Sequence, residues 1–179
     1  MSAFELRCRE CGKSYGNIPQ SICHECFSPL EVFYDYEAIR PSFTRERIAA
    51  GPASMWRYRD LLPLPDGYQP ALPTGFTPLL NAPQLGAAVG SKSLYLKNDA
   101  VCMPSLSFKD RVVSVALAQA RAFGFEVVSC SSTGNLANAV AAHAARNGFQ
   151  AWIFIPSDLE AAKVVGTQVF GAKVVRISG

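Results

Sequence analysis

The sequence predicts an α/β fold in which helices flank a parallel sheet, preceded by a small cysteine-rich segment. From Phe108 onward, amphipathic helical stretches alternate with short strands, which is the pattern of βαβ units. These strands are continuously apolar, as in a parallel sheet covered by helices on both faces. The first 35 residues differ in texture because they hold four of the six cysteines.

The four N-terminal cysteines form two Cys-x-x-Cys pairs, Cys8 with Cys11 and Cys23 with Cys26, separated by eleven residues. This is the spacing of a four-cysteine zinc ribbon, in which four thiolates hold a structural Zn²⁺ tetrahedrally. Gly12 follows the first pair, where a tight turn needs it, and the second pair lacks such a glycine. Disulfides or merely buried thiols are the alternatives, and both rank below zinc in a sequence without a secretion signal. We therefore expect a zinc ribbon over residues 1–35.

Two further cysteines, Cys102 and Cys130, stand apart from these pairs. Each is expected to be a small buried apolar residue rather than a nucleophile.

Residues 36–75 are expected to form an irregular connecting segment, because turn-forming residues interrupt them repeatedly. Six prolines lie in this stretch: Pro41, Pro52, Pro63, Pro65, Pro70 and Pro73. One short helix is expected there, capped by Thr44, running to Ala50 and ended by Gly51.

Residues 76–179 are expected to form the main α/β unit. Strands are predicted near 77–80 and 94–97, followed by helices at 108–123, 135–147 and 159–170. Further strands are predicted between and after these helices, at 126–130, 151–155 and 173–177.

One lysine lies at the expected start of a helix. The segment from Pro104 to Arg111 reads Pro-Ser-Leu-Ser-Phe-Lys-Asp-Arg and sets Lys109 behind small hydroxylated residues. Covalent catalysis by lysine needs the neutral amine, which partial burial and the positive end of a helix both favour. For Lys109 alone, an ordinary surface lysine paired with an acid is the better explanation.

A second polar loop follows the apolar pair Val127 and Val128 and begins the next helix. It reads Ser-Ser-Thr-Gly-Asn over residues 131–135. Gly134 would let the backbone approach a ligand closely, and the first free N–H groups of the helix would form an anion site. Helix capping explains any one of these residues, but four in succession at the carboxyl end of a parallel strand exceed what capping needs.

In order and spacing, the two motifs together resemble those of the fold type II pyridoxal-phosphate enzymes. The Ser-Phe-Lys-Asp-Arg wording most resembles the threonine synthase family. The resemblance covers roughly residues 76–179, with the zinc ribbon as an N-terminal addition. It implies pyridoxal 5'-phosphate as the cofactor, held covalently by Lys109, which would be the catalytic residue and would also move protons.

The resemblance also implies roles for the neighbours of Lys109. Phe108 would contact the cofactor ring, and Asn135 would hydrogen-bond the phenolic oxygen of the cofactor. Ser132, Thr133 and Asn135, with the backbone N–H groups around Gly134, would hold the substrate carboxylate.

The implied reaction is that of a carbon–oxygen lyase in threonine biosynthesis, which converts O-phosphohomoserine and water to threonine and phosphate. Another fold type II enzyme, cysteate synthase-like or threonine dehydratase-like, would share Lys109 and Asn135 and differ in the pocket for the leaving group. A third alternative is a non-enzymatic zinc-ribbon interaction module fused to a degenerate α/β domain.

The sequence departs from the family pattern at three places. Leu106 stands where many relatives have glycine. Leu136 stands where relatives often have alanine or threonine. Gly179 precedes the glycine-rich loop that binds the cofactor phosphate in the family. We therefore expect residues 1–179 to be the N-terminal part of a longer enzyme and to show little catalysis alone.

Three other polar residues have simpler structural explanations. Lys97 with Asp99 matches a family pattern, and a strand-end salt bridge between them is at least as good an explanation. His143 is expected to be a packed or helix-face histidine, since no acid is spaced along the sequence to orient it.

Composition limits the remaining alternatives. The formal net charge of +3 is small, and no run of like charge indicates a nucleic-acid partner. Acidic residues also intersperse Arg7, Arg9 and Lys13 in the ribbon. No apolar segment reaches membrane-spanning length, so we expect a cytoplasmic protein with no membrane partner. A homo-oligomer is compatible with the sequence, which does not fix the number of subunits.

Overall fold

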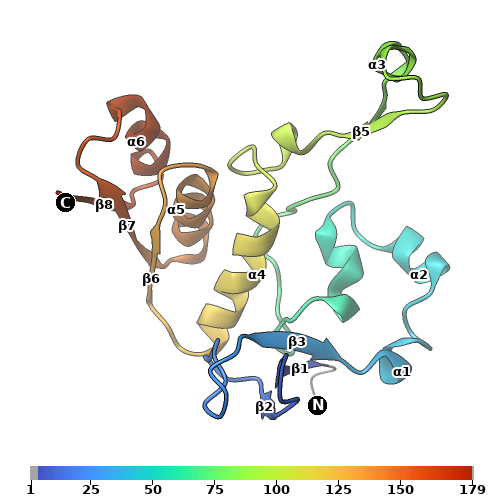
Figure 1. Ribbon diagram of the computed structural model, residues 1–179, viewed down its shortest axis with the longest axis horizontal. Helices are drawn as coiled ribbons and strands as arrows, with labels where there is room; N and C mark the ends of the chain where they lie inside the picture. Colours follow the sequence, from blue (N-terminus) through green and yellow to red (C-terminus); the bar gives the residue numbers. More distant parts are fainter. Residues whose placement is uncertain (1–3, 179) are drawn as a thin grey trace.

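The computed structural model describes residues 4–178, apart from the side chain of Lys163, and contains three small sheets (Figure 1). An antiparallel sheet lies at the N-terminus, a two-stranded sheet forms a projecting arm, and a parallel sheet forms the C-terminal part.

The N-terminal sheet contains β1 (Phe4–Cys8), β2 (Ser14–Gly16) and β3 (Leu30–Tyr34) in the order β2-β1-β3. Strands β1 and β3 pair antiparallel, with Phe4 opposite Tyr34 and Cys8 opposite Leu30. The sheet thereby holds the turns that carry the two cysteine pairs at one end.

The connecting segment is more helical than expected. It contains α1 (Tyr36–Ile39), α2 (Arg45–Ala50) and a 3₁₀ helix, η1 (Met55–Leu61). The expected capping of α2 is confirmed, because Thr44 Oγ1 accepts a hydrogen bond from Arg47 N at 3.3 Å and Gly51 ends the helix. Trp56 in η1 is buried and donates its indole N–H to Leu72 O at 2.7 Å. The segment therefore packs as an ordered layer.

The arm consists of β4 (Leu79–Asn81), α3 (Pro83–Ala88) and β5 (Tyr95–Lys97), with β4 and β5 antiparallel. It extends away from the rest of the chain (Figure 1). A short 3₁₀ turn, η2 (Asp99–Val101), leads from the arm back to the main unit.

The main unit alternates helix and strand, as predicted. Its elements are α4 (Lys109–Ala122), β6 (Val127–Ser131), α5 (Asn135–Asn147), β7 (Gln150–Pro156), α6 (Ala161–Gln168) and β8 (Lys173–Ile177). The three strands form a parallel sheet in the order β6-β7-β8.

The expectation that helices cover both faces of this sheet is wrong for the described residues. Helices α5 and α6 pack against each other and against the sheet, so they cover the same face. On β7, Ala151, Ile153 and Ile155 are buried beneath them, whereas Trp152 and Phe154 alternate with these residues and are only half-buried. A continuous apolar strand is typical of double coverage, but apolarity alone does not say which element lies against each face.

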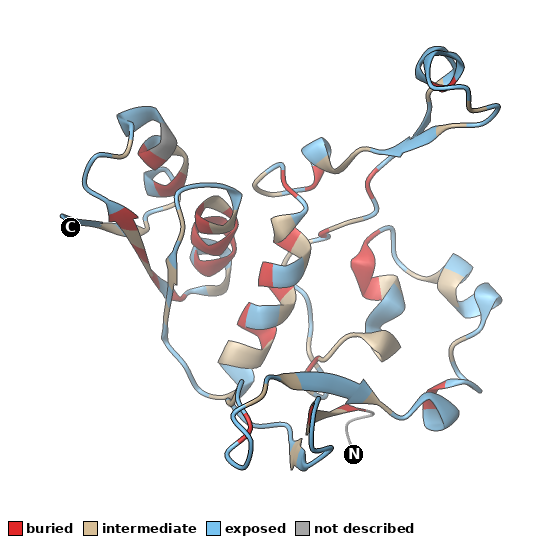
Figure 2. Ribbon diagram, viewed as in Figure 1, coloured by how far each residue is buried: buried red, intermediate tan, exposed pale blue. Residues whose placement is uncertain are grey.

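Helix α4 is shared between two apolar clusters. Val113 and Leu117 join a cluster with α5, α6 and β7, while Ala118 joins Met55, Trp56 and Leu64 in a second cluster. The buried positions therefore lie along more than one side of α4 and along α5 (Figure 2). No helix among residues 4–178 has both the length and the apolar character needed to cross a membrane.

Candidate active site and metal centre

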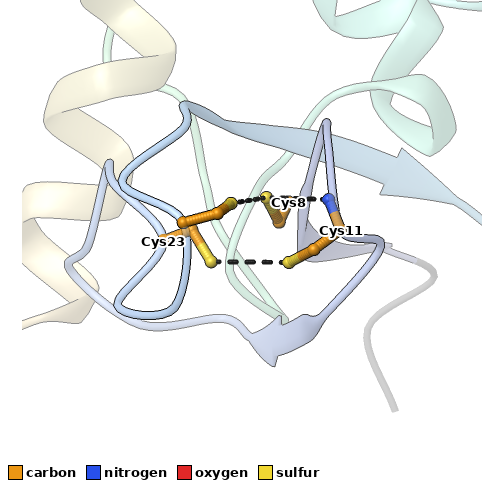
Figure 3. A group of neighbouring side chains, drawn as sticks. Cys8, Cys11 and Cys23 are labelled. Atoms are coloured by element: carbon orange, nitrogen blue, oxygen red, sulfur yellow. Dashed lines mark hydrogen bonds between the residues drawn. The ribbon is translucent and has the colours of Figure 1, made fainter.

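The four N-terminal cysteines converge at one end of the antiparallel sheet (Figure 3). The Sγ atoms of Cys8, Cys11, Cys23 and Cys26 all lie within 4.8 Å of one another. Cys8 Sγ lies 3.4 Å from Cys26 Sγ, and Cys11 Sγ lies 3.6 Å from Cys23 Sγ. A tetrahedron with metal–sulfur bonds of about 2.3 Å has sulfur–sulfur edges of about 3.8 Å, so the cluster has the dimensions of a four-thiolate zinc site.

Both cysteine pairs adopt the same turn. Gly12 N donates to Cys8 O at 3.1 Å with φ +71° at Gly12, and Phe27 N donates to Cys23 O at 3.0 Å with φ +57° at Phe27. The second pair has no glycine after it, because Phe27 follows Cys26. The structure instead forms the turn with a phenylalanine in the left-handed region, where L-residues are strained.

Hydrogen bonds around the cluster favour thiolate at Cys23. Burial opposes its ionisation, but donors outweigh this effect and lower the pKa of Cys23 to about 6. The strongest donor is Tyr15 Oη, 3.0 Å from Cys23 Sγ, and Glu25 N lies 3.4 Å from the same sulfur. These groups surround the sulfur as donors surround metal-bound thiolates.

Lys109 is the first residue of α4 and is half-buried. Its Nζ lies 5.1 Å from the ring centroid of Phe108, which is itself mostly exposed. Ser107 Oγ accepts a hydrogen bond from Lys109 N at 3.3 Å, and Asp110 Oδ2 lies 3.4 Å from Ser107 N. These contacts join Ser107, which lies just before the N-cap Phe108, to the first turn of α4 and so hold the backbone on either side of Lys109.

The turn before Lys109 contains a strained residue. Leu106 has φ +59° and an exposed side chain, so neither its conformation nor its burial favours leucine there. A glycine would adopt this φ without strain.

The second polar loop follows β6 as expected. Gly134 precedes α5, no side chain caps this helix end, and Asn135 is the first helical residue. A Cβ built on Gly134 would meet no atom within 4 Å, so the backbone there faces open space that a ligand can enter. Thr133 and Asn135 are exposed, and Ser132 is half-buried. Gly134 N donates to Ser132 Oγ at 3.4 Å. The uncapped start of α5 and the polar side chains of the loop suit an anion.

The helices that carry the two motifs pack against each other. Arg121 donates to Asn147 O where the two helices end, and a buried contact joins them nearer the start of α4. His143 Nε2 of α5 lies 3.2 Å from Asp110 Oδ1 of α4, with 2% and 0% of the side chains exposed. His143 is eight residues from Asn135, or about 12 Å along the helix. Lys109 and Asn135 are the first residues of α4 and α5, and these two helices pack against each other. The sequence alone shows no acid that could orient His143, because Asp110 is its neighbour only in the folded chain.

The salt bridge between Lys97 and Asp99, one of the two explanations from the sequence, does not form in the structure. Asp99 pairs with Arg111 rather than with Lys97: Oδ1 and Oδ2 lie 2.7 Å from Arg111 Nη2 and Nη1. Thr77 Oγ1 donates to Asp99 Oδ1 at 2.7 Å, while Lys97 donates to Thr77 O. Arg111 was not singled out from the sequence, and its place two residues after Lys109 was the only signal available.

Comparisons with known proteins agree with this geometry. Residues 71–179 match the family model described as pyridoxal-phosphate dependent enzyme. The threonine synthase of Methanocaldococcus jannaschii is 37% identical over 97% of this chain, and that of Methanosarcina acetivorans is 34% identical over 98%. The chain spans 43% of the length of each of these two relatives.

A solved structure shares the fold of part of this chain. The processed form of threonine deaminase isoform 2 from Solanum lycopersicum matches with a TM-score of 0.51 and 26% identity. The match covers 57% of this chain and 28% of that one.

Proposed function

This chain belongs to the pyridoxal-phosphate-dependent enzyme family, and from that premise we propose that it provides the lysine-bearing part of a threonine synthase-like lyase. The proposed reaction converts O-phosphohomoserine and water to threonine and phosphate. The observation that carries the proposal is the Lys109 helix packed against the helix that begins at Asn135, in a chain that aligns with threonine synthases over nearly its whole length.

The residues present fit pyridoxal phosphate. Lys109 is half-buried at a helix start, where an amine can meet an aldehyde. The open backbone at Gly134 and the uncapped start of α5 suit an anionic group, and the exposed amide of Asn135 can donate to a ring oxygen. Phe108, exposed beside Lys109, offers an apolar face to the ring.

When bound, the cofactor supplies an electron sink for charge that develops next to the substrate amine. The remaining steps fall to residues of the chain. Lys109 holds the cofactor and then moves protons with its amine. Ser132, Thr133, Asn135 and the N–H groups around Gly134 bind the substrate carboxylate and so fix which bond faces Lys109.

The test uses the natural protein that contains these residues. Borohydride treatment in the presence of pyridoxal phosphate should leave a pyridoxyl mass on the Lys109 peptide, and Lys109→Ala should abolish both this label and phosphate release from O-phosphohomoserine. Normal turnover by Lys109→Ala would contradict the proposal.

A threonine dehydratase-like activity is the second candidate, supported by the structural similarity to tomato threonine deaminase. Ammonia release from threonine without phosphate release from O-phosphohomoserine would favour it. Lys109 would be required in both cases, so the leaving group separates the two candidates.

We also propose that Cys8, Cys11, Cys23 and Cys26 bind one structural Zn²⁺. The support is the size of the sulfur cluster and the donors around Cys23. With four protein ligands no position is left for substrate, so the ion would stabilise the ribbon rather than react. The unpaired state of all six cysteines fits a reducing compartment and supports a cytoplasmic location.

A further inference from the structure

The buried contact between Asp110 and His143 is not explained by helix capping. The N-cap of α4 is Phe108, and no side chain caps this helix, so capping gives no reason to bury Asp110. Here the carboxylate is fully buried and faces an imidazole from another helix. Neither side chain can reach water, so each depends on the other and on the nearby turn for its polar contacts.

The carboxylate of Asp110 organises the turn before Lys109. Its Oδ2 accepts a hydrogen bond from Ser105 N at 3.0 Å, and its Oδ1 accepts one from Ser105 Oγ at 2.9 Å. With the longer contact from Ser107 N, the carboxylate spans the turn whose middle residue is the strained Leu106. Such a turn persists only when surrounding contacts hold it.

His143 connects this turn to α5. Its Nε2 is at hydrogen-bond distance from Asp110 Oδ1 but has no well-aligned acceptor, so the contact is mainly electrostatic. A histidine among alanines is costly to bury unless a charge or an acceptor faces it. The pair therefore links the turn before Lys109 to the helix that begins at Asn135.

We propose that Asp110 and His143 form a positioning pair, which sets the direction of the Lys109 side chain relative to the Asn135 loop. The proposal rests on the proposed function, because it assigns the pair a role only if Lys109 binds the cofactor. Neither residue of the pair touches the reacting atoms; both act through the turn at residues 105–107.

The experiment measures how readily Lys109 accepts pyridoxal phosphate. The amine condenses with the aldehyde and releases water, and borohydride reduces the carbon–nitrogen double bond to a stable amine. The labelled fraction of the Lys109 peptide is then followed by mass spectrometry against cofactor concentration. His143→Leu removes the polar group that faces Asp110, and His143→Gln keeps a polar N–H group in the same region.

His143→Leu should need roughly tenfold more cofactor for half-labelling, since small misplacements of a reactive group are costly, and His143→Gln should recover most of the loss. Phe149→Leu serves as a stability control, because Phe149 is buried in the apolar cluster just after the C-terminal end of α5 and lies outside residues 105–107 and 132–135. It should lower the melting temperature and leave the labelling midpoint unchanged.

Equal labelling midpoints for His143→Leu and Phe149→Leu would overturn the positioning role. If His143→Leu does not fold, Ser105→Ala replaces it, because that change removes only the hydroxyl contact with Asp110, and an unchanged midpoint would again overturn the role. A wild-type protein in which Lys109 is never labelled would instead overturn the proposed function and the pair's role with it.

Discussion

Arg111 directs both terminal guanidinium nitrogens at the carboxylate of Asp99, each at 2.7 Å from an oxygen. This bidentate pair fastens η2, at the base of the projecting arm, to the first turn of α4. Thr77, just before β4, donates to the same carboxylate. The arm is therefore attached close to Lys109.

The Asp99 contact makes stability depend on pH in a defined window. Hydrogen bonds from Arg111 and Thr77 lower the pKa of Asp99 from 3.8 to about 2. Because the folded-state pKa is depressed, the stabilisation is complete above about pH 4 and is lost as the pH falls toward 2. Asp99→Asn should lower the free energy of unfolding by about 1 kcal/mol at pH 6, and less at pH 3.

Urea denaturation at pH 6, 4 and 3 measures this difference. Asp66→Asn, at an exposed position, is the control and should show a much smaller change. A wild-type advantage over Asp99→Asn that stays constant down to pH 3 would show that the charge of Asp99 does not contribute.

Metal removal should unfold the ribbon selectively. The purified chain should contain about one zinc, and a strong chelator should remove it, because within residues 4–178 only the four-cysteine cluster has the required ligand set. Hydrogen exchange should then rise in β1 and β3 and change little in β7. Metal content is read by elemental mass spectrometry.

Two cysteine variants provide the comparison for this experiment. Cys23→Ser should lose the zinc, whereas Cys130→Ala, in β6, should keep it. Equal metal contents in the two variants would exclude the cluster as the binding site.

The left-handed conformation of Phe27 predicts a stabilising substitution. Phe27 is 80% exposed, so little buried area is lost on replacement. Phe27→Gly should raise the stability of the ribbon by up to about 1 kcal/mol, because relief of strain exceeds the entropic cost of glycine. Phe27→Val should lower it, since a β-branched residue tolerates this conformation poorly. Chelator titrations that monitor ribbon unfolding would rank the three proteins, and a ranking with glycine last would refute the strain argument.

Gly75 and Gly67 form a matched pair for testing close packing. Both have positive φ, +87° and +70°, but a Cβ on Gly75 would lie 3.0 Å from Met55 Cβ, whereas one on Gly67 would meet nothing within 4 Å. Gly67→Ala should cost about 1 kcal/mol from backbone strain alone. Gly75→Ala should cost at least about twice as much because Met55 must also move. Thermal unfolding monitored by circular dichroism compares the two variants. Equal losses of stability would mean that Met55 moves aside at no measurable cost.

Local signals predicted the main unit well. The helix at 135–147 and the strand at 173–177 begin and end as expected. For the helix, the polar loop before it and Gly148 after it mark both ends in the sequence. The short helix α3 was missed because six residues are too few to show helical periodicity.

Contacts between distant elements could not be predicted in the same way. Asp110 meets His143, and Asp99 meets Arg111, only because α4 packs against α5 on one side and receives η2 at its start. The sequence identified Lys109 and Asn135 through their local motifs, whereas the residues that hold those motifs in place carry no motif. The roles of Lys109, Asn135 and the Ser132–Gly134 loop remain predictions for the labelling experiment.

The sharing of α4 between two clusters has a consequence for folding. Val113 and Leu117 belong to one cluster and Ala118 to the other, so melting of either cluster would bare part of the same helix to water. The main unit and the connecting segment are thus coupled into one cooperative unit through α4. Loosening of the connecting segment would therefore disturb the position of the Lys109 amine at the start of this helix.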